Sequence, residues 1–256
     1  MTQGYVIIAQ NTSEVDYECC ARVLQKSLKL AGDTRPVTII NDVVTDQYGP
    51  YYSDTLAYDR SPYDETFKLE ADMIVTRSLD SWWRFCEHRN LYIATGCRDI
   101  KQQMSKDTYY RKTIVDNKLP DTYNGITYFK KSKIAKQFYR IVETIFKNWK
   151  QVNESLEHPS VLKYGDTDTV YAIAASIIGE QLCTEPNNII QWIHAKKRIN
   201  RFISEDWTTE LTWELVDSDF RINTLSQMYP VHYHVKSLAQ LLEPLYDRKI
   251  QTLLQQ

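Results

Sequence analysis

The stretch that decides the fold is Ser61-Pro62-Tyr63-Asp64-Glu65-Thr66-Phe67-Lys68-Leu69-Glu70-Ala71-Asp72. It opens with a turn signal, and residues 66–69 predict a short strand that closes on two carboxylates, Glu70 and Asp72. Side chains alternate along a strand, so both carboxylates should point to the same side of the chain. Oxygen ligands of this kind suit a hard divalent cation such as Mg2+ or Mn2+. The alternative is a strand with an acidic solvent face, and the motif taken alone favours that alternative.

The composition is that of an ordinary globular chain of 256 residues, with 43% apolar residues and a net charge of -2. This charge neither predicts nor excludes a polyanionic partner. The five cysteines are odd in number and lack a metal-binding spacing, so we expect no disulfide framework. The sequence shows no signal peptide and no apolar run of membrane length. We therefore expect a soluble protein of a reducing compartment, the cytoplasm, without a membrane partner.

The N-terminal part predicts a strand, a helix and a second strand. Residues 5–9 form a continuous apolar run, typical of a strand covered on both faces. Residues 15–30 carry apolar side chains at helical spacing, with Ser13 as candidate N-cap and Gly32 after the last turn. The second strand spans residues 37–40. This order is typical of an open α/β sheet, where ligands bind beyond the carboxyl ends of the strands. The polar residues at those ends are Gln10, Asn11, Asn41 and Asp42.

The rest of the chain continues with strands and helices and shows no clear domain boundary. Residues 45–60 predict an irregular loop or short helix. We expect strands at residues 92–95, 126–129 and 188–194, and helices at 81–88, 132–152, 169–178 and 237–254. Asp166 and Asp168 stand at the start of one of these helices, where the helix dipole favours acids. We expect a single domain overall, with a main part at residues 1–203 and an extension at 204–256 packed on it.

This order of elements resembles the nucleotide-diphospho-sugar transferase, or GT-A, fold, and most of all its retaining galactosyltransferase- and glycogenin-like branch. The resemblance covers about residues 4–198 and rests on Glu70-Ala-Asp72, Tyr123-Asn124-Gly125, Asp166-Thr-Asp168 and a late histidine. Ser61-Pro-Tyr-Asp-Glu-Thr before Glu-Ala-Asp-Met also resembles glycosyltransferase-like proteins of tailed bacteriophages. The resemblance implies an α/β fold with a Rossmann-like mixed sheet flanked by helices and a helical C-terminal extension. It implies a glycosyltransferase, located in the host cytoplasm if the chain is phage-encoded.

The family places a divalent metal, Mn2+ or Mg2+, on its acid-x-acid motif, which implies Glu70 and Asp72 as ligands here. Glu70 stands where the family usually has Asp, which keeps the charge and lengthens the arm. A late histidine completes the family's metal site. His194, at the end of a predicted strand, is our first choice. The alternatives are His232 and His234, and for any of them a structural role is the competing interpretation.

Other site residues follow from the same resemblance. It implies Asp166 and Asp168 near the donor sugar and Asn124 on the acceptor side, although the spacer residue of the family's Asn motif is absent. Candidates for binding the nucleotide, with UDP-sugar as the expected donor, are Gln10, Asn11, Tyr17, Asp42, Arg60 and Lys196. Lys197 and Arg111 are further candidates for the diphosphate. Each of these cations is also readily explained as a solvated surface charge, and Asn11 and Asp42 as turn formers.

The acceptor stays open between several hydroxyl compounds. A hydroxymethylated base in phage DNA is one hypothesis, supported by lysines at 130, 131, 133 and 136 beside aromatic residues and opposed by the overall acidity. A saccharide, a protein or a small molecule are the others. A nucleotidyltransferase of similar fold is a rival, but residues 9–16 contain no glycine for its phosphate loop. A non-catalytic binding module is a second rival. The sugar, the stereochemical outcome and the oligomeric state are not specified by the sequence.

Overall fold

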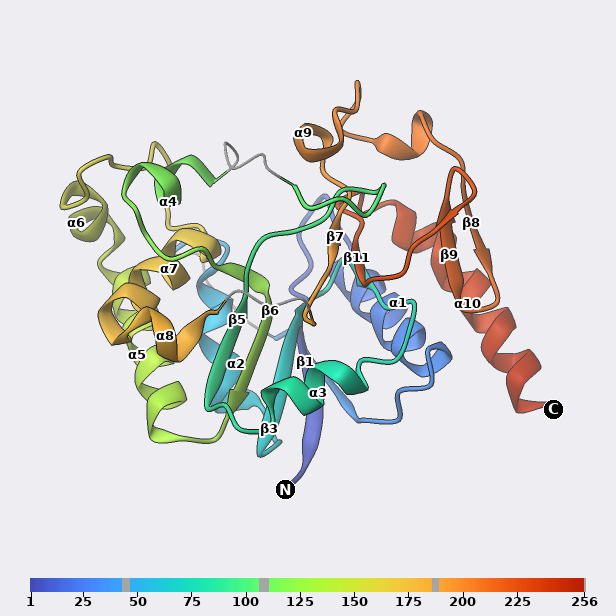
Figure 1. Cartoon of the computed structure of the whole chain (residues 1–256), viewed down its shortest axis with the longest axis horizontal. Helices are drawn as coiled ribbons and strands as arrows, with labels where there is room; N and C mark the ends of the chain where they lie inside the picture. The colour runs from blue at the N-terminus through green and yellow to red at the C-terminus, as the bar shows by residue number, and fades with distance from the viewer. Residues whose placement is uncertain (43–46, 106–110, 186–188, 256) are drawn as a thin grey trace.

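The computed structural model describes residues 1–42, 47–105, 111–185 and 189–255. Its centre is a five-stranded sheet in the order β2-β1-β3-β6-β5 (Figure 1). The strands are β1 (Gln3–Ile8), β2 (Val37–Ile40), β3 (Glu65–Glu70), β5 (Leu91–Ala94) and β6 (Tyr123–Lys130). β1 runs parallel to β2 and β3, whereas β6 is antiparallel to β3 and β5. The mixed sheet expected from the sequence is therefore confirmed.

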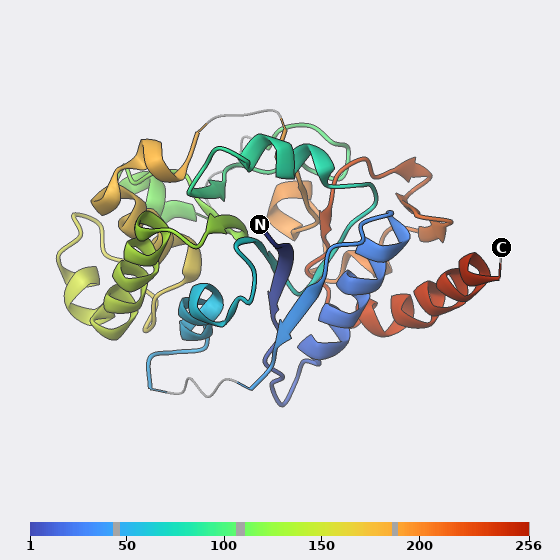
Figure 2. The ribbon, with the colours of Figure 1, turned by 90° about the horizontal axis from the view of Figure 1, so that it is seen from below.

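Helices cover both faces of this sheet, because alternate side chains of the central strands are apolar on both sides. Tyr5 and Ile7 of β1 belong to one core cluster, and Val6 between them belongs to the other. The first cluster includes side chains of α1 (Tyr17–Leu30), α3 (Asp80–Cys86) and α10 (Leu238–Leu254), and the second those of α2 (Ala57–Arg60), α5 (Lys133–Lys147) and α7 (Thr167–Ile178). Figure 2 shows α1 and α10 side by side, away from α5.

Two small sheets complete the fold. β11 (Val231–His232) lies between β4 (Met73–Ile74), to which it is antiparallel, and β7 (Ile193–His194), to which it is parallel. β8 (Trp213–Val216), β9 (Asp219–Ile222) and β10 (Leu225–Ser226) form an antiparallel meander. The chain after Asp72, which begins with Met73 and Ile74 of β4, thus leaves the central sheet and enters a second one. The remaining helical segments are η1 (Tyr52–Leu56), α4 (Lys112–Asp116), α6 (Trp149–Glu154), α8 (Glu180–Cys183), α9 (Lys197–Asn200) and η3 (Trp207–Thr209).

Three local expectations are corrected. Asp16, not Ser13, caps α1, because its carboxylate accepts a hydrogen bond from the Cys19 N–H at 2.9 Å. The helix expected at 132–152 breaks at Asn148, whose side-chain amide donates to the Thr144 carbonyl at 2.8 Å and so competes with the backbone. The strand expected at 188–194 is limited to β7, since its partner β11 offers only two residues; residue 188 lies outside the described residues.

From residue 47 on, the loop after β2 forms turns followed by η1 and α2. This agrees with the irregular loop or short helix predicted at 45–60, of which residues 45–46 lie outside the described residues. Within the described ranges, no helix has both the length and the apolar character needed to cross a bilayer. Two strand ends matter most for function, because β1 and β3 end at the same level of the sheet, with Ile8 opposite Glu70.

Candidate functional site

Glu70 and Asp72 lie where the central sheet ends. Glu70 is the last residue of β3, and Asp72 follows in the turn that leads to β4. The Asp72 side chain is buried, and that of Glu70 is half-buried at the floor of a cleft. The strand must stop here because the chain turns away toward β11, and this turn brings both acids to a third group from the far end of the chain.

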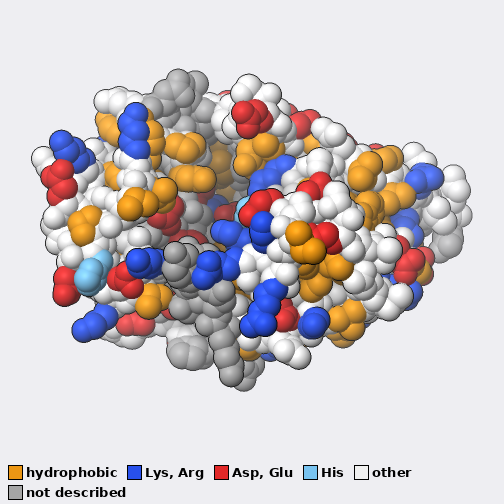
Figure 3. Space-filling model, turned by 90° about the horizontal axis from the view of Figure 1, so that it is seen from above, with side chains coloured by type: hydrophobic (Ala, Val, Ile, Leu, Met, Phe, Trp, Pro, Cys, Tyr) orange, Lys and Arg blue, Asp and Glu red, His pale blue; other side chains and the backbone are white. Residues whose placement is uncertain are grey.

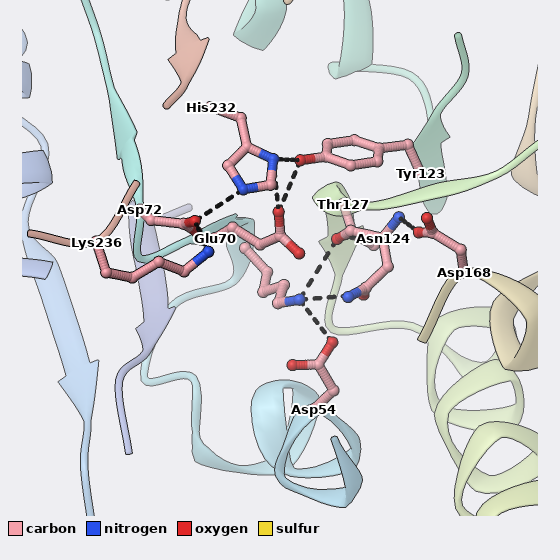
Figure 4. A network of polar contacts seen from close by, with 10 residues as sticks. Asp54, Glu70, Asp72, Tyr123, Asn124, Thr127, Asp168, His232 and Lys236 are labelled. Atoms are coloured by element: carbon pink, nitrogen blue, oxygen red, sulfur yellow. Dashed lines mark hydrogen bonds and ion pairs between the residues drawn. The ribbon is translucent and has the colours of Figure 1, made fainter. Parts of the chain in front are cut away.

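That third group is His232 of β11. Its Nε2 lies 2.9 Å from Asp72 Oδ2, and its Nδ1 lies 3.3 Å from Glu70 Oε2 (Figure 4). Within the described part of the chain, Glu70, Asp72 and His232 form the group of ligand atoms that could hold a metal ion, all within 4.8 Å of one another. Two carboxylate oxygens and an imidazole nitrogen at this spacing suit a small divalent cation.

Positive charge already balances the acids. Lys236 Nζ lies 2.6 Å from the same Asp72 oxygen that contacts His232. Burial alone would raise the pKa of Asp72, but His232 and Lys236 outweigh it and hold that pKa well below its ordinary value. Burial likewise opposes the charged form of His232, yet Asp72 and Glu70 raise its pKa. The two acids of the site therefore stabilise positively charged groups beside them.

Tyr123, the first residue of β6, supports this group. Its hydroxyl donates to Glu70 Oε2 at 2.6 Å and lies 2.5 Å from His232 Nδ1, while its ring stacks on Trp192 at 3.6 Å. The Tyr123 hydroxyl thus contacts an acid and the histidine of the cluster at once, and each of the two ring nitrogens of His232 has a polar partner.

The choice between histidines is informed by this geometry. The His194 ring is buried and stacks nearly parallel to the His232 ring, with 4.6 Å between the two ring centroids. The ring centroid of His234 lies 5.3 Å from that of His232. Burial, and then the charge of His232, lowers the pKa of His194 well below its ordinary value. His194 thus lies beside the cluster of Glu70, Asp72 and His232, and its ring nitrogens are not among the candidate ligand atoms of that cluster. The metal-binding histidine stays a prediction, and His232 is the one whose ring nitrogens lie close to both acids.

A second pair of acids faces the same cleft. Asp166 caps α7 by accepting from the Thr169 N–H at 2.9 Å, and Asp168 lies in the first turn. The main-chain N–H of Asn124 donates to Asp168 Oδ1 at 2.8 Å. Burial raises the pKa of Asp168 to about 6, with Arg111 acting in the opposite direction. α7 begins at Thr167, directly after Asp166, so the helix start predicted from Asp166-Thr-Asp168 is confirmed.

The cleft has a volume of about 680 Å³, enough for a nucleotide-sized ligand. Glu70, His232 and Tyr123 lie on its lining together with Asp166 and Asp168. Figure 3 shows the hollow from above, with acidic and basic side chains around it. Further lining residues relevant to the predictions are His194, His234, Lys196 and Arg111.

The residues predicted for the nucleotide divide into two sets. Lys196 and Arg111 line the cleft, and Arg111 pairs with Asp121. Tyr17 is half-buried, and burial raises its pKa, with Lys236 and Asp72 acting on it as well. Neither Tyr17 nor the remaining candidates are on the cleft lining: Gln10 is exposed after β1, Asn11 accepts from the Glu18 N–H, Asp42 pairs with Arg60, and Lys197 opens α9.

Tyr123 and Lys236 contact the cluster, and neither was a predicted site residue; Lys68, which lies behind the cleft and not on its lining, was not predicted either. Tyr123 was visible as part of Tyr-Asn-Gly, and Lys236 as the lysine that follows His232-Tyr233 at short spacing. No signal marked Lys68, because a lysine in the middle of a strand is ordinarily a surface residue.

No family model matches the sequence, and no curated protein matches it. Solved structures do match. The galactosyltransferase LgtC in complex with donor and acceptor sugar analogs aligns with a TM-score of 0.53 at 12% identity, covering 94% of this chain and 95% of LgtC. A glycosyltransferase involved in the glycosylation of the major capsid of PBCV-1 aligns with a TM-score of 0.52 at 9% identity, covering 97% and 100%.

The glycosyltransferase GlyE of Streptococcus pneumoniae TIGR4 aligns with a TM-score of 0.50 at 11% identity over the whole of this chain, which spans 64% of the length of GlyE. At these identities the similarity concerns the fold. It confirms the GT-A fold expected from the sequence.

Proposed function

We propose that this chain is a metal-dependent glycosyltransferase that moves a sugar from a nucleotide diphosphate sugar, most simply a UDP-sugar, to a hydroxyl acceptor. The observation that carries the proposal is the convergence of Glu70, Asp72 and His232 at the end of β3, on a cleft that also holds Asp166 and Asp168. A GT-A fold with a cation-favouring group at this sheet edge supports a diphosphate site there.

The charges of the cleft suit the reaction. The acceptor oxygen forms a bond to the anomeric carbon, the bond from that carbon to the diphosphate breaks, and the acceptor proton is lost to a base or to the leaving group. Negative charge develops on the leaving diphosphate. Mn2+ or Mg2+ held by Glu70, Asp72 and His232 would supply electrostatic stabilisation of that charge. Lys236 and Lys196 add positive charge from the chain itself.

The remaining side chains orient the substrates in this proposal. Asp166 and Asp168 offer carboxylate oxygens to sugar hydroxyls, and Asp168, with a pKa of about 6, is mostly ionised at neutral pH. Asn124, the residue that the sequence suggested for the acceptor side, is buried away from the cleft lining and holds Asp168 through its main-chain N–H instead. Tyr123 keeps Glu70 and His232 in place.

We further propose that the acceptor is a saccharide or a protein. The similar LgtC was crystallised with an acceptor sugar analog, and the similar viral enzyme takes part in capsid glycosylation. The hydroxymethylated base in phage DNA stays a prediction from the sequence that none of these similar structures supports. The nucleotidyltransferase and the non-catalytic module are the rival functions.

The first experiment measures thermal stability with a panel of nucleotide sugars, with and without Mn2+. We expect at least one donor to raise the melting temperature, and to do so more strongly with Mn2+. Hydrolysis of that donor should fall about 100-fold or more in Asp72→Asn. Asp59→Asn, at an exposed position of α2, is the matched control and should keep full activity. A panel without any stabilising donor contradicts the transferase proposal.

The acceptor is tested with the donor so identified. It is incubated separately with saccharides, with protein, and with hydroxymethylcytosine DNA beside plain DNA, and the mass of each product is measured. A mass gain on modified DNA alone would support the phage-DNA hypothesis. Turnover of donor with any acceptor rules out the binding module, and release of nucleoside diphosphate rather than pyrophosphate rules out the nucleotidyltransferase.

A further inference from the structure

Lys68 is a buried cation behind the cleft. It lies in the middle of β3 with its side chain 2% exposed, and by strand alternation it points to the same side as Glu70. Its ammonium contacts Asp54 Oδ2 at 2.6 Å, Asn124 Oδ1 at 3.0 Å and the Asn124 main-chain carbonyl at 3.4 Å. Burying an ammonium is costly unless it is paired and hydrogen-bonded, so these partners explain how it is tolerated.

Asn124 is held from two sides by this arrangement. A lysine ammonium can only donate, so the amide oxygen of Asn124 must face Lys68, and its NH2 group must point elsewhere. The Asn124 carbonyl also accepts from Thr127 Oγ1 at 3.1 Å. On the opposite side of the residue, the main-chain N–H donates to Asp168 at 2.8 Å.

These contacts form one chain of charges and dipoles across the fold. It runs from Asp54 of η1, through Lys68 of β3 and Asn124 of β6, to Asp168 of α7. Only its last member lines the cleft, and neither Lys68 nor Asp54 does. The chain therefore joins a layer remote from the ligand to a carboxylate that faces it.

We propose that Lys68 is a positioning residue, which fixes the orientation of Asn124 and, through the Asn124 N–H, the place of the Asp168 carboxylate in the cleft. The inference rests on the proposed function for its catalytic consequence only. A purely structural lysine would merely balance Asp54. A positioning lysine must in addition restrain the N–H···carboxylate bond between Asn124 and Asp168.

The test uses a charge-neutral pair, Lys68→Met/Asp54→Asn, because removing one partner alone would leave an unpaired buried charge. Hydrogen exchange of the Asn124 main-chain amide is measured by NMR. We expect it to speed up by about tenfold, since the bond to Asp168 is no longer restrained. The Ala9 amide, bonded to the Ile40 carbonyl at 2.8 Å in the sheet, is the internal control and should not change.

A second variant keeps the proposal testable if the neutral pair does not fold. Lys68→Arg retains a positive charge opposite Asp54, but the larger planar guanidinium holds its donors in a fixed fork and should disturb the contacts that the compact ammonium makes with the two oxygens of Asn124. Faster exchange at Asn124 is again expected. Unchanged exchange at Asn124 in a folded variant would overturn the proposal and leave Lys68 as a charge balance.

Kinetics supply the catalytic readout. In the neutral pair, kcat for the responsive donor should fall about 10- to 100-fold through misplacement of Asp168, while adding Asn124→Ala should cause no further loss. Additive losses would contradict coupling through Asn124. Because hydrogen exchange needs no substrate, the positioning role is decided even if no nucleotide sugar is turned over, and that second result would count against the proposed function alone.

Discussion

One carboxylate oxygen of Asp72 contacts two basic side chains of the site. It accepts from His232 and from Lys236, so both cations stand where an added divalent ion would bind. The two cations allow the acids to be buried without an ion, since buried charges must be paired. A metal therefore has to compete with groups of the chain itself, and the strength of this competition can be measured.

Replacing Lys236 by Gln should tighten Mn2+ binding in the absence of nucleotide. The substitution removes a cation 2.6 Å from Asp72, so less of the negative charge of this carboxylate is neutralised by the chain itself. We expect an affinity gain of about tenfold by isothermal titration calorimetry. Lys133→Gln, an exposed position at the start of α5, is the control that should bind as the wild type does. Weaker binding in Lys236→Gln would show that Lys236 supports the ion instead of competing with it.

Gly125 gives the site its tight packing. A Cβ at this position would lie 2.5 Å from the Tyr123 ring and 2.6 Å from Glu70 Oε2. Gly125→Ala should therefore push Tyr123 or Glu70 aside, weaken Mn2+ binding, and lower the free energy of unfolding by about 1–3 kcal/mol, as overpacking does. Calorimetric titration and urea denaturation measure the two effects. An Ala variant with wild-type metal affinity would mean that Tyr123 does not hold Glu70 in place.

Among the elements, α1 and α10 are joined by a charge cluster remote from the cleft. Glu243 of α10 lies 2.7 Å from Arg22 Nε and 3.0 Å from Lys26 Nζ, both of α1. The hydrogen bond from Arg22, with further help from Lys26, lowers the pKa of Glu243 to about 2. The ionised form is thus stabilised in the folded chain, and the pairing holds α10 against the N-terminal helix.

Glu243→Gln should cost about 1 kcal/mol at pH 7, because the cluster is partly exposed and screened by solvent. A depressed folded pKa contributes stability above the ordinary pKa near 4.5, and this contribution is lost as the pH falls toward 2. The difference from wild type should therefore be constant near neutrality and shrink below about pH 4.5. Urea denaturation at several pH values measures it, with the exposed Glu180→Gln as control. A difference that persists at pH 2 would point to packing instead of charge.

For the whole molecule, residues 204–255 contribute several buried side chains to the core. Phe220, Val231, Tyr233 and Leu242 belong to the same buried cluster as Tyr5 and Phe67. The same segment also supplies His232 and Lys236 to the site. The division at residue 203 expected from the sequence therefore corresponds to an extension that shares both the core and the candidate site with the main part.

We expect the chain to unfold in one cooperative step, with circular dichroism and tryptophan fluorescence giving coincident transitions. A fragment of residues 1–203 should fail to fold cooperatively and should not bind Mn2+, because it exposes one side of the core and lacks His232. Truncation after residue 247, beyond the buried Tyr246, is the control that should retain the transition. A cooperatively folding 1–203 fragment would establish it as a domain of its own.

Much of this could be predicted from short-range patterns. Apolar runs located β1, β2 and the strand of Glu70, and Asp166-Thr-Asp168 located the start of α7. These features depend on neighbours in sequence, whose periodicity and capping chemistry are local. The start of the strand that ends at His194 and the break at Asn148 were predicted wrongly, since the length of the partner strand and side-chain competition decided them.

By itself, the sequence predicted the succession of strands and helices along the chain and the acid pair at the end of β3, because alternation and helical spacing act along the chain. The GT-A type of fold followed from the resemblance of that succession and its motifs to the family. Only the tertiary structure decided which histidine meets Glu70 and Asp72, that Tyr123 and Lys236 join them, and that Lys68 is buried behind Asn124. The contacts of Asp72 with His232 and Lys236 join residues 160 positions apart or more. Their partners depend on how β11 pairs between β4 and β7, which no local pattern encodes.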